Sequence, residues 1–179
     1  MGLFARLFTL LFGLGGVLIA VGLMRTRQTR GSPKQEQFLA GRVPAPLPDG
    51  FYEGSADFDT RSWKGKTFSA VDGSGKNVFA GDDGTRQEQY PFRTYVSAGL
   101  QDREINVLKI DYDIPENPLW LRRVVDEVVE VGEGKLLGKV HVRLVPGLPF
   151  SLGYFRLTNT AASDAAVGKP AADTVPASF

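Results

Sequence analysis

Between residues 51 and 157 the chain is a series of short segments in which apolar and polar residues alternate, separated by Gly, Asp, Asn and Pro. Alternation with a period of two is typical of β-strands that bury one face. Short connections favour antiparallel pairing, and such a sheet must hide its edges by closing or by folding onto itself. We therefore predict a mainly β fold, a small antiparallel β-barrel, with a β-sandwich as the alternative. About eight strands are expected, at 51–58, 62–71, 77–82, 90–100, 103–114, 127–131, 135–144 and 149–157.

An apolar segment precedes this domain. Residues 7–24 are eighteen positions without a charge, and a helix of that length spans about 27 Å, close to the bilayer's hydrocarbon thickness of roughly 30 Å. We predict that residues 1–24 form a transmembrane helix, which makes the lipid bilayer a partner of a single-pass membrane protein. A cleaved secretory signal is the alternative. More basic residues follow the segment than precede it, which favours a domain on the cytoplasmic side.

The remaining regions flank the predicted domain. Residues 25–50 are basic at first and then rich in proline, and they are expected to form an extended linker. Residues 159–179 are rich in Ala, Ser, Asp, Thr and Pro and are expected to form a disordered tail. Residues 51–158 then make one domain, the predicted barrel.

Composition argues against several functions. The chain has no cysteine, which excludes disulfides and thiolate nucleophiles. Residues 51–157 hold 14 Lys and Arg against 16 Asp and Glu, a net charge near −2, so nucleic-acid binding is not expected. His141 is the one histidine, and alternation places it opposite Val140 and Val142, in solvent. A Ser-His-Asp site and a zinc site are therefore poorly supported, and no metal or cofactor is expected.

The segment DYDIPENPLWLRR, residues 111–123, concentrates charged, aromatic and proline residues. Alternation turns Asp111 and Asp113 outward and places Tyr112 on the apolar face of its strand. Asn117 followed by Pro118 is typical of a helix N-terminus. The segment is therefore interpreted as a strand-to-helix corner that covers one end of the barrel.

Helical spacing extends this corner. Leu121, Val124, Val125 and Val128 fall at the spacing of one helix face, which predicts a helical turn or two. Arg122 and Arg123 are expected near the acids at 126 and 127, which follow three or four residues later. A functional alternative is that these two arginines, with Trp120, border an open barrel mouth and receive an anionic headgroup.

Four blocks carry a resemblance to a known family: SWKGKTF (62–68), KIDYDIP (109–115), LRRVVDEVVEVGEGKLLG (121–138) and FSLGYFRL (150–157). In their order they resemble the GXWXG-type family of small lipocalin-like proteins, and the Trp and Gly of the first block are also similar to the opening of calycin barrels. The resemblance implies a calycin-like barrel that holds an apolar molecule. It implies no particular biochemical activity.

Three hypotheses about function follow. The leading one is a non-enzymatic, membrane-anchored, lipocalin-like protein that binds a small apolar or amphipathic ligand, lipids included. A membrane-tethered interaction module would instead have a filled interior, and a barrel enzyme would have polar groups converging inside it. Trp63 either plugs one end of the barrel or lines a cavity. The candidate ligand-binding residues are Trp63, Tyr112, Trp120, Arg122 and Arg123.

Overall fold

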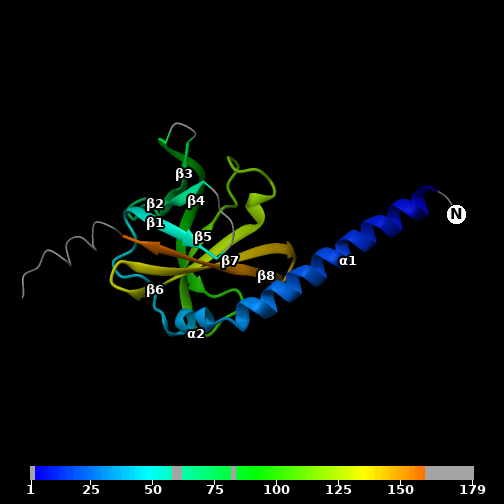
Figure 1. The fold of residues 1–179 in the computed structure, drawn as a ribbon, viewed down its shortest axis with the longest axis horizontal. Helices are drawn as coiled ribbons and strands as arrows, with labels where there is room; N and C mark the ends of the chain where they lie inside the picture. Colours follow the sequence, from blue (N-terminus) through cyan, green and yellow to red (C-terminus); the bar gives the residue numbers. More distant parts are fainter. Residues whose placement is uncertain (1–2, 58–61, 82–83, 160–179) are drawn as a thin grey trace, which may run out of the picture.

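The protein is a closed barrel of eight antiparallel strands preceded by helices (Figure 1). The computed structural model describes residues 3–57, 62–81 and 84–159, with side chains from Gly15 onward. Each strand pairs with the next along the chain, and the last pairs with the first, so the closed barrel replaces the β-sandwich alternative. The elements are α1 (Leu3–Arg30), α2 (Pro33–Ala40), β1 (Gly50–Ala56), β2 (Trp63–Ser69), β3 (Ser74–Ala80), β4 (Arg86–Ala98), β5 (Asn106–Asp111), η1 (Leu121–Arg123), β6 (Val124–Gly132), β7 (Lys135–Val145) and β8 (Leu148–Thr158).

The expected strands are all present, because their alternation matches a sheet with one face toward a common interior. Gly65, the glycine of the SWKGKTF block, has φ +143°, and an ideal Cβ at this position would lie 2.0 Å from the carbonyl oxygen of Tyr52 on β1. Only glycine allows β1 and β2 to approach this closely. The inward side chains form one core cluster: Tyr52, Phe68, Phe92, Leu108, Ile110, Tyr112, Leu121, Val128, Leu136, Phe155 and Leu157.

A second apolar cluster lies on the outside of the barrel, beneath the helices. Phe38 of α2 is fully buried and contacts the Tyr154 ring, with 6.2 Å between the ring centroids. Val129 and Leu137, which point outward from β6 and β7, complete this cluster together with Val107. The barrel wall is therefore covered on one side, and strands β6 and β7 are buried on both faces.

Helix α1 lies alongside β8, and its N-terminal part extends beyond the barrel (Figure 1). An ideal Cβ on Gly22 would lie 2.7 Å from the Phe150 ring, and the Thr26 hydroxyl accepts the Ser151 amide at 2.9 Å. Further along the chain, Gln35 of α2 accepts a 2.6 Å hydrogen bond from the Tyr154 hydroxyl of β8. Residue numbers increase in the same direction along α1 and β8, because Gly22 meets Phe150 and Thr26 meets Ser151. The N-terminal part of α1 therefore projects past the start of β8, at the barrel end that carries the β7–β8 connection.

The linker expected at 25–50 is wrong over its first part. α1 continues to Arg30, and α2 begins directly after Ser32, whose side chain accepts the amide of Lys34. Pro33 at the first helical position favours this start, and burial of Phe38 holds the helix on the barrel. The extended chain predicted from the prolines begins only after Gly41.

A helical turn is present at the predicted corner, but the prediction that helical spacing extends from Leu121 to Val128 is wrong after Arg123. The helical turn is confined to η1, and β6 begins at Val124. Both faces of β6 are buried, so apolar residues occur on both, and the pairs Val124–Val125 and Val128–Val129, four residues apart, imitate the spacing of a helix face. Asn117 does not cap a helix: its side-chain amide donates to the carbonyl oxygens of Pro91 and Tyr112, and this fixes the corner.

Over the side chains that the structure describes, no helix is both long enough and apolar enough to cross a membrane. Residues 7–14 of the predicted span lie outside these side chains. Residues 160–179 of the predicted tail lie outside the described residues as well. Both expectations stay predictions.

Candidate functional site

A cavity of about 300 Å³ occupies one end of the barrel interior. This end carries the β1–β2, β3–β4, β5–β6 and β7–β8 connections, because the cavity meets the last residue of β1, the end of β3 and the turn before β6. Its volume is at the lower end of the range typical of small-molecule sites. The lining residues are Ala56, Trp63, Lys66, Asn77, Phe79, Tyr90, Tyr112, Trp120, Leu121, Val124, Asp126, Val140 and Phe155.

Aromatic rings form most of the wall. Trp63 packs edge-on against Phe155 at 5.9 Å, while Tyr90 contacts Phe79 at 5.7 Å and Trp120 at 6.3 Å between ring centroids. Trp120 is 65% exposed and stands at the rim. Tyr90 has φ +53°, a left-handed conformation that bulky residues rarely adopt. Strained backbone of this kind clusters at ligand sites, and here it accompanies a ring that connects the wall to the rim.

The cavity floor is polar and buried. Lys66 Nζ lies 3.1 Å from Asp126 Oδ2, donates to Asn77 Oδ1 at 2.9 Å, and also donates to the Tyr112 hydroxyl. The Tyr112 hydroxyl donates to Asp126 at 3.2 Å, and the Trp63 indole N–H donates to Asn77 Oδ1 at 3.1 Å. Three acceptors surround the three protons of the Lys66 ammonium. The floor is therefore an ion pair held by neutral hydrogen-bonding groups.

Electrostatics at the floor follow from its burial. Burial lowers the pKa of Lys66, and the neighbouring Asp126 carboxylate partly opposes that effect. The pKa of Tyr112 is raised well above its usual value, first by burial and then by Asp126, so its hydroxyl keeps its proton. The Lys66 ammonium also lies 5.1–5.6 Å from the ring centres of Trp63, Phe92, Tyr112 and Phe155, within cation–π range.

One acceptor at the floor has no partner. Asp126 Oδ1 is buried and accepts no hydrogen bond from any described residue, although Oδ2 of the same carboxylate has two partners. An unpaired buried carboxylate oxygen is costly. A ligand with a hydrogen-bond donor would remove that cost.

The structure divides the candidate residues predicted from the sequence between two places. Trp63, Tyr112 and Trp120 meet at the cavity, and Trp63 lines it and does not plug the barrel. Arg122 and Arg123 line a separate cleft of about 400 Å³ on the outside. The turn η1 explains this division, because Leu121 points into the barrel and the two residues after it point out.

Arg122 does not pair with the acids at 126 and 127. It donates to Asp113 at 2.7 Å, and Arg143 donates to Asp111 at 2.9 Å. The two aspartates of the corner point outward as alternation predicts, and there they hold arginines of η1 and β7.

Sequence reasoning missed the polar floor, although a signal was present. Lys66 shares its strand face with Phe68, and Asp126 shares its face with Val124 and Val128. A charged residue on the apolar face of a strand is unusual unless it is paired. Neither residue stood out by itself, because the partner lies on a strand distant in sequence.

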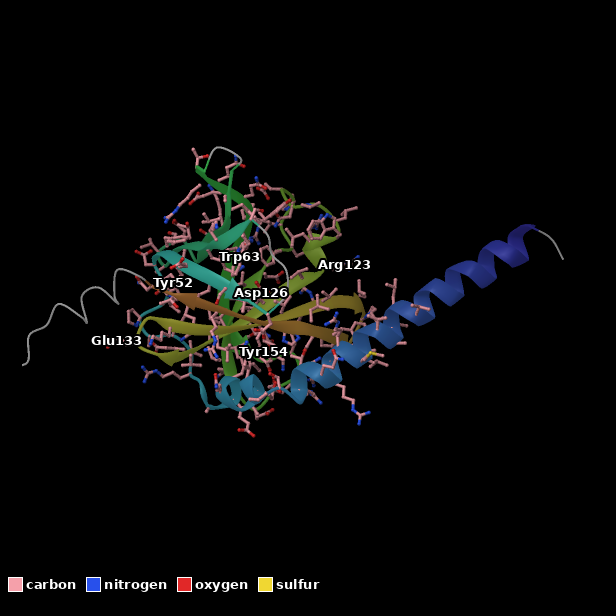
Figure 2. The ribbon with its side chains drawn as sticks, in the orientation of Figure 1. Tyr52, Trp63, Arg123, Asp126, Glu133 and Tyr154 are labelled. Carbon is pink, nitrogen blue, oxygen red and sulfur yellow. The ribbon has the colours of Figure 1, made fainter. Side chains whose placement is uncertain are left out.

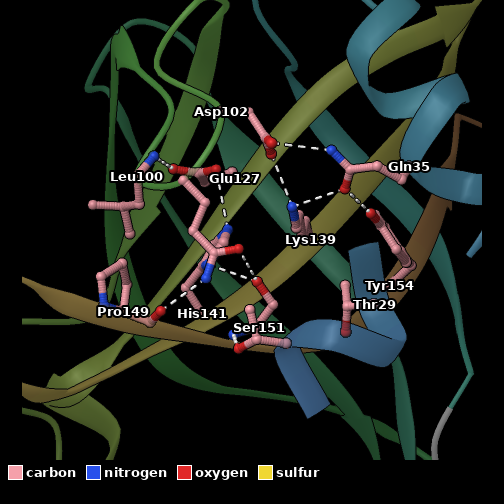
Figure 3. A network of polar contacts seen from close by, with 12 residues as sticks. Thr29, Gln35, Leu100, Asp102, Glu127, Lys139, His141, Pro149, Ser151 and Tyr154 are labelled. Carbon is pink, nitrogen blue, oxygen red and sulfur yellow. Dashed lines mark hydrogen bonds and ion pairs between the residues drawn. The ribbon is translucent and has the colours of Figure 1, made fainter. Parts of the chain in front are cut away.

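His141 is not in solvent. It points outward from β7, opposite Val140 as predicted, but it is fully buried beneath α1 and the β4–β5 loop. Its Nε2 lies 3.1 Å from Glu127 Oε2, and its Nδ1 lies 3.2 Å from the Ser151 hydroxyl oxygen (Figure 3). The residues of a serine–histidine–carboxylate arrangement are thus in contact. Ser151 is fully buried, lines none of the described pockets and donates to Gln101, so the arrangement offers no access to a substrate.

The same network holds the helices to the barrel. Lys139 Nζ donates to Asp102 at 2.8 Å and to Gln35 at 2.9 Å (Figure 3). Lys109 pairs with Glu127. Burial acts to raise the pKa of Glu127, but His141 and Lys109 outweigh it and hold this pKa at about 2. The buried charges of the outer face therefore connect α2, the β4–β5 loop, β6 and β7.

Comparisons with known proteins identify no family for this chain. No protein-family model matches the chain, and no curated protein matches its sequence. A crystal structure of a protein from Thermomonospora curvata is similar, with a TM-score of 0.47 and 17% sequence identity, over 66% of this chain and 79% of that one. The fold class is a closed eight-stranded antiparallel β-barrel with an N-terminal helix.

Proposed function

We propose that this protein is a membrane-anchored, lipocalin-like barrel that binds a small amphipathic molecule in the cavity below Trp120. The observation that carries the proposal is the cavity itself: aromatic walls, a buried polar floor, and an unpartnered carboxylate oxygen on Asp126. Apolar walls with a few placed polar groups are typical of small-molecule sites. As part of the same proposal, the barrel is related to the lipocalin-like, GXWXG-type proteins.

The floor specifies the polar group of the ligand. Lys66 already neutralises Asp126, so the floor offers no unpaired positive charge to a carboxylate ligand. The floor acceptor without a partner is the buried Asp126 Oδ1, and a hydroxyl or an amine that reaches it would supply the missing donor. We therefore expect a short-chain apolar molecule that carries a hydrogen-bond donor, with its apolar part against Trp63, Tyr90 and Phe155.

The anchor is residues 7–24, which carry no charge. From Val17 to Met24 the apolar side chains of α1 are exposed, and only Gly22 in this stretch is buried, against Phe150. A helix that presents apolar residues all round suits a membrane better than water. The basic residues that follow favour a barrel on the cytoplasmic side.

Tryptophan fluorescence provides a direct test, because the two tryptophans of the chain both line the cavity. The full chain in detergent or in lipid nanodiscs is titrated with the apolar fluorophore N-phenylnaphthylamine. We expect saturable energy transfer from Trp63 and Trp120, competed by a small amphipathic alcohol such as decanol. Native mass spectrometry with solvent extraction tests for a co-purifying molecule. Absence of both signals would contradict ligand binding.

The two alternatives predict different results. An interaction module needs a filled interior, and the cavity argues against it. A barrel enzyme is favoured by the inward Lys66, Asp126 and Tyr112, and it predicts chemical turnover of the bound molecule in the mass spectrum. Recovery of the bound molecule unchanged favours the binding protein.

A further inference from the structure

Exposed apolar side chains gather at the barrel end that holds the cavity. Large apolar residues are normally exposed singly, and a group of them marks an interaction surface. Trp120 stands at the cavity rim, and the others lie on the β5–β6 connection and around the β7–β8 connection. The exposed residues of this group are Leu119, Trp120, Leu144, Leu148 and Leu152.

Arginines lie among these residues. The cleft of about 400 Å³ is lined by Arg103, Arg122, Arg123, Arg143 and one acid, Asp113, together with the tip of the β7–β8 hairpin. Arg122 and Arg143 are paired with aspartates. Within the described part of the chain, Arg103 and Arg123 form no ion pair, and both are exposed. The cleft therefore keeps positive charge that the protein does not neutralise.

The apolar segment of α1 extends from the same end of the barrel (Figure 1). The uncharged segment extends to Met24, whereas contact between helix and barrel already begins at Gly22. If the segment lies in a bilayer, the barrel next to Phe150 must lie at the bilayer surface. Figure 2 places Arg123 on the side toward which α1 projects and Glu133 on the opposite side.

We propose that this surface, defined by Leu119, Trp120, Arg123, Leu144 and Leu148 and called here the membrane-facing end, docks on an anionic phospholipid bilayer. The inference rests on the proposed anchoring by α1. Guanidinium groups bind phosphate in bidentate geometry, basic residues close to a membrane are attracted to anionic lipid, and tryptophan is enriched at the lipid–water interface. Leucines at the tip of a hairpin can enter the headgroup region beside them.

Docking has a consequence for the cavity. Trp120 belongs both to the cavity rim and to the membrane-facing end. The mouth of the cavity therefore faces the bilayer, and an amphipathic ligand passes between lipid and barrel without entering bulk water. The source of the ligand is the membrane on which the barrel sits.

The absence of cysteine from the chain permits a clean test. A nitroxide is attached to Leu148→Cys at the membrane-facing end, or to Glu133→Cys in the exposed β6–β7 turn as the matched control. The full-length variants are reconstituted in vesicles of phosphatidylcholine, alone or mixed with phosphatidylglycerol. Oxygen, which concentrates in lipid, and a nickel chelate, which stays in water, are compared as relaxing agents.

We expect oxygen to relax the label at 148 more than the nickel chelate does, with the reverse at 133. The preference for oxygen at 148 should increase with phosphatidylglycerol, and Arg103→Gln/Arg123→Gln, which removes the two unpaired charges of the cleft, should remove that increase. Arg42→Gln, an exposed arginine that pairs with Glu130 away from this end, should leave the increase intact. This pattern supports docking.

Other outcomes overturn the inference in distinguishable ways. If labels at 148 and 133 respond alike while the chain still floats with vesicles, docking is wrong and the anchor stands. If the label at 148 is shielded from both agents, protein and not lipid covers this end, as in a second copy of the chain. If the chain does not float with vesicles, anchoring and docking both fail, whereas ligand binding is judged separately by fluorophore titration.

Discussion

Lys66 and Asp126 form an ion pair inside the barrel, with 3.1 Å between Nζ and Oδ2 and side chains that are 3% and 5% exposed. The two residues reach this contact from β2 and β6, which are not neighbours in the sheet. Desolvation makes such a pair costly to build, and the loss of one partner is more costly still. Variants of the pair can therefore be used to measure its effect on stability separately from its effect on ligand binding.

Removal of one partner should destabilise the protein, and removal of both should restore much of the stability. Lys66→Met leaves the Asp126 carboxylate buried without a counterion, with an expected loss of about 3–5 kcal/mol in the free energy of unfolding. The double variant Lys66→Met/Asp126→Leu should recover most of this loss. Urea unfolding of the full chain in detergent, followed by tryptophan fluorescence, measures all three proteins. A double variant as unstable as the single one would contradict a simple pairing role.

The cavity should discriminate between ligands of equal chain length by their polar group. Decanol can donate to Asp126 Oδ1, whereas decanoate would bring a second negative charge to the same floor. Decanol should therefore displace N-phenylnaphthylamine at a concentration about tenfold lower, which corresponds to about 1.4 kcal/mol. The double variant Lys66→Met/Asp126→Leu serves as the control, because it lacks both charges and should bind the two competitors more equally. If the native protein preferred decanoate, the proposed hydrogen bond between the ligand and Asp126 would be contradicted.

The fold could be predicted from the sequence because alternation is a local signal. Strands such as β5 and β7 show one apolar and one polar face without reference to any other part of the chain. Trp63, Tyr112 and Trp120 could likewise be selected as candidates, because aromatic residues at strand ends and corners stand out by themselves. The structure brings these three to one cavity.

Other features depend on contacts between distant segments, which alternation does not report. His141 has the polar position that alternation predicts, but whether that face meets water depends on α1 and the β4–β5 loop, which cover it. Lys66 can be recognised as a site residue only when Asp126 is known to lie close to it in space. The register that joins them comes from closure of the barrel and not from either strand alone.

Acid should weaken the outer network through Glu127. His141 and Lys109 hold its pKa at about 2, against a usual value of 4.5. A lowered folded-state pKa stabilises the protein above pH 4.5, and that contribution is lost as pH falls from 4.5 toward 2. The shift corresponds to about 3 kcal/mol at neutral pH. Glu127→Gln should therefore be less stable at pH 7, and its difference from the native protein should shrink as unfolding is measured at progressively lower pH.

The contact among Ser151, His141 and Glu127 should not act as a hydrolase. Ser151 is fully buried and its hydroxyl donates to Gln101 at 2.7 Å, so no substrate reaches it. A fluorophosphonate probe should leave the native full chain unlabelled. Ser151→Ala should cost about 1 kcal/mol of stability through the lost hydrogen bonds. Labelling of the native chain that disappears in Ser151→Ala would show instead that the site opens and that the serine is nucleophilic.

Attachment of α1 to the barrel should depend on the absence of a side chain at Gly22. An ideal Cβ there would lie 2.7 Å from the Phe150 ring, too close for any residue but glycine unless helix or ring moves. Gly22→Leu should therefore separate α1 from β8 and break the bond from the Ser151 amide to Thr26, with an expected cost of about 1–3 kcal/mol. Hydrogen exchange of the Ser151 amide, measured on the full chain in nanodiscs, should accelerate accordingly. Gly16→Leu is the matched control, since nothing lies within 4 Å of a Cβ at that position, and exchange that is equally fast in both variants would refute a specific contact at Gly22.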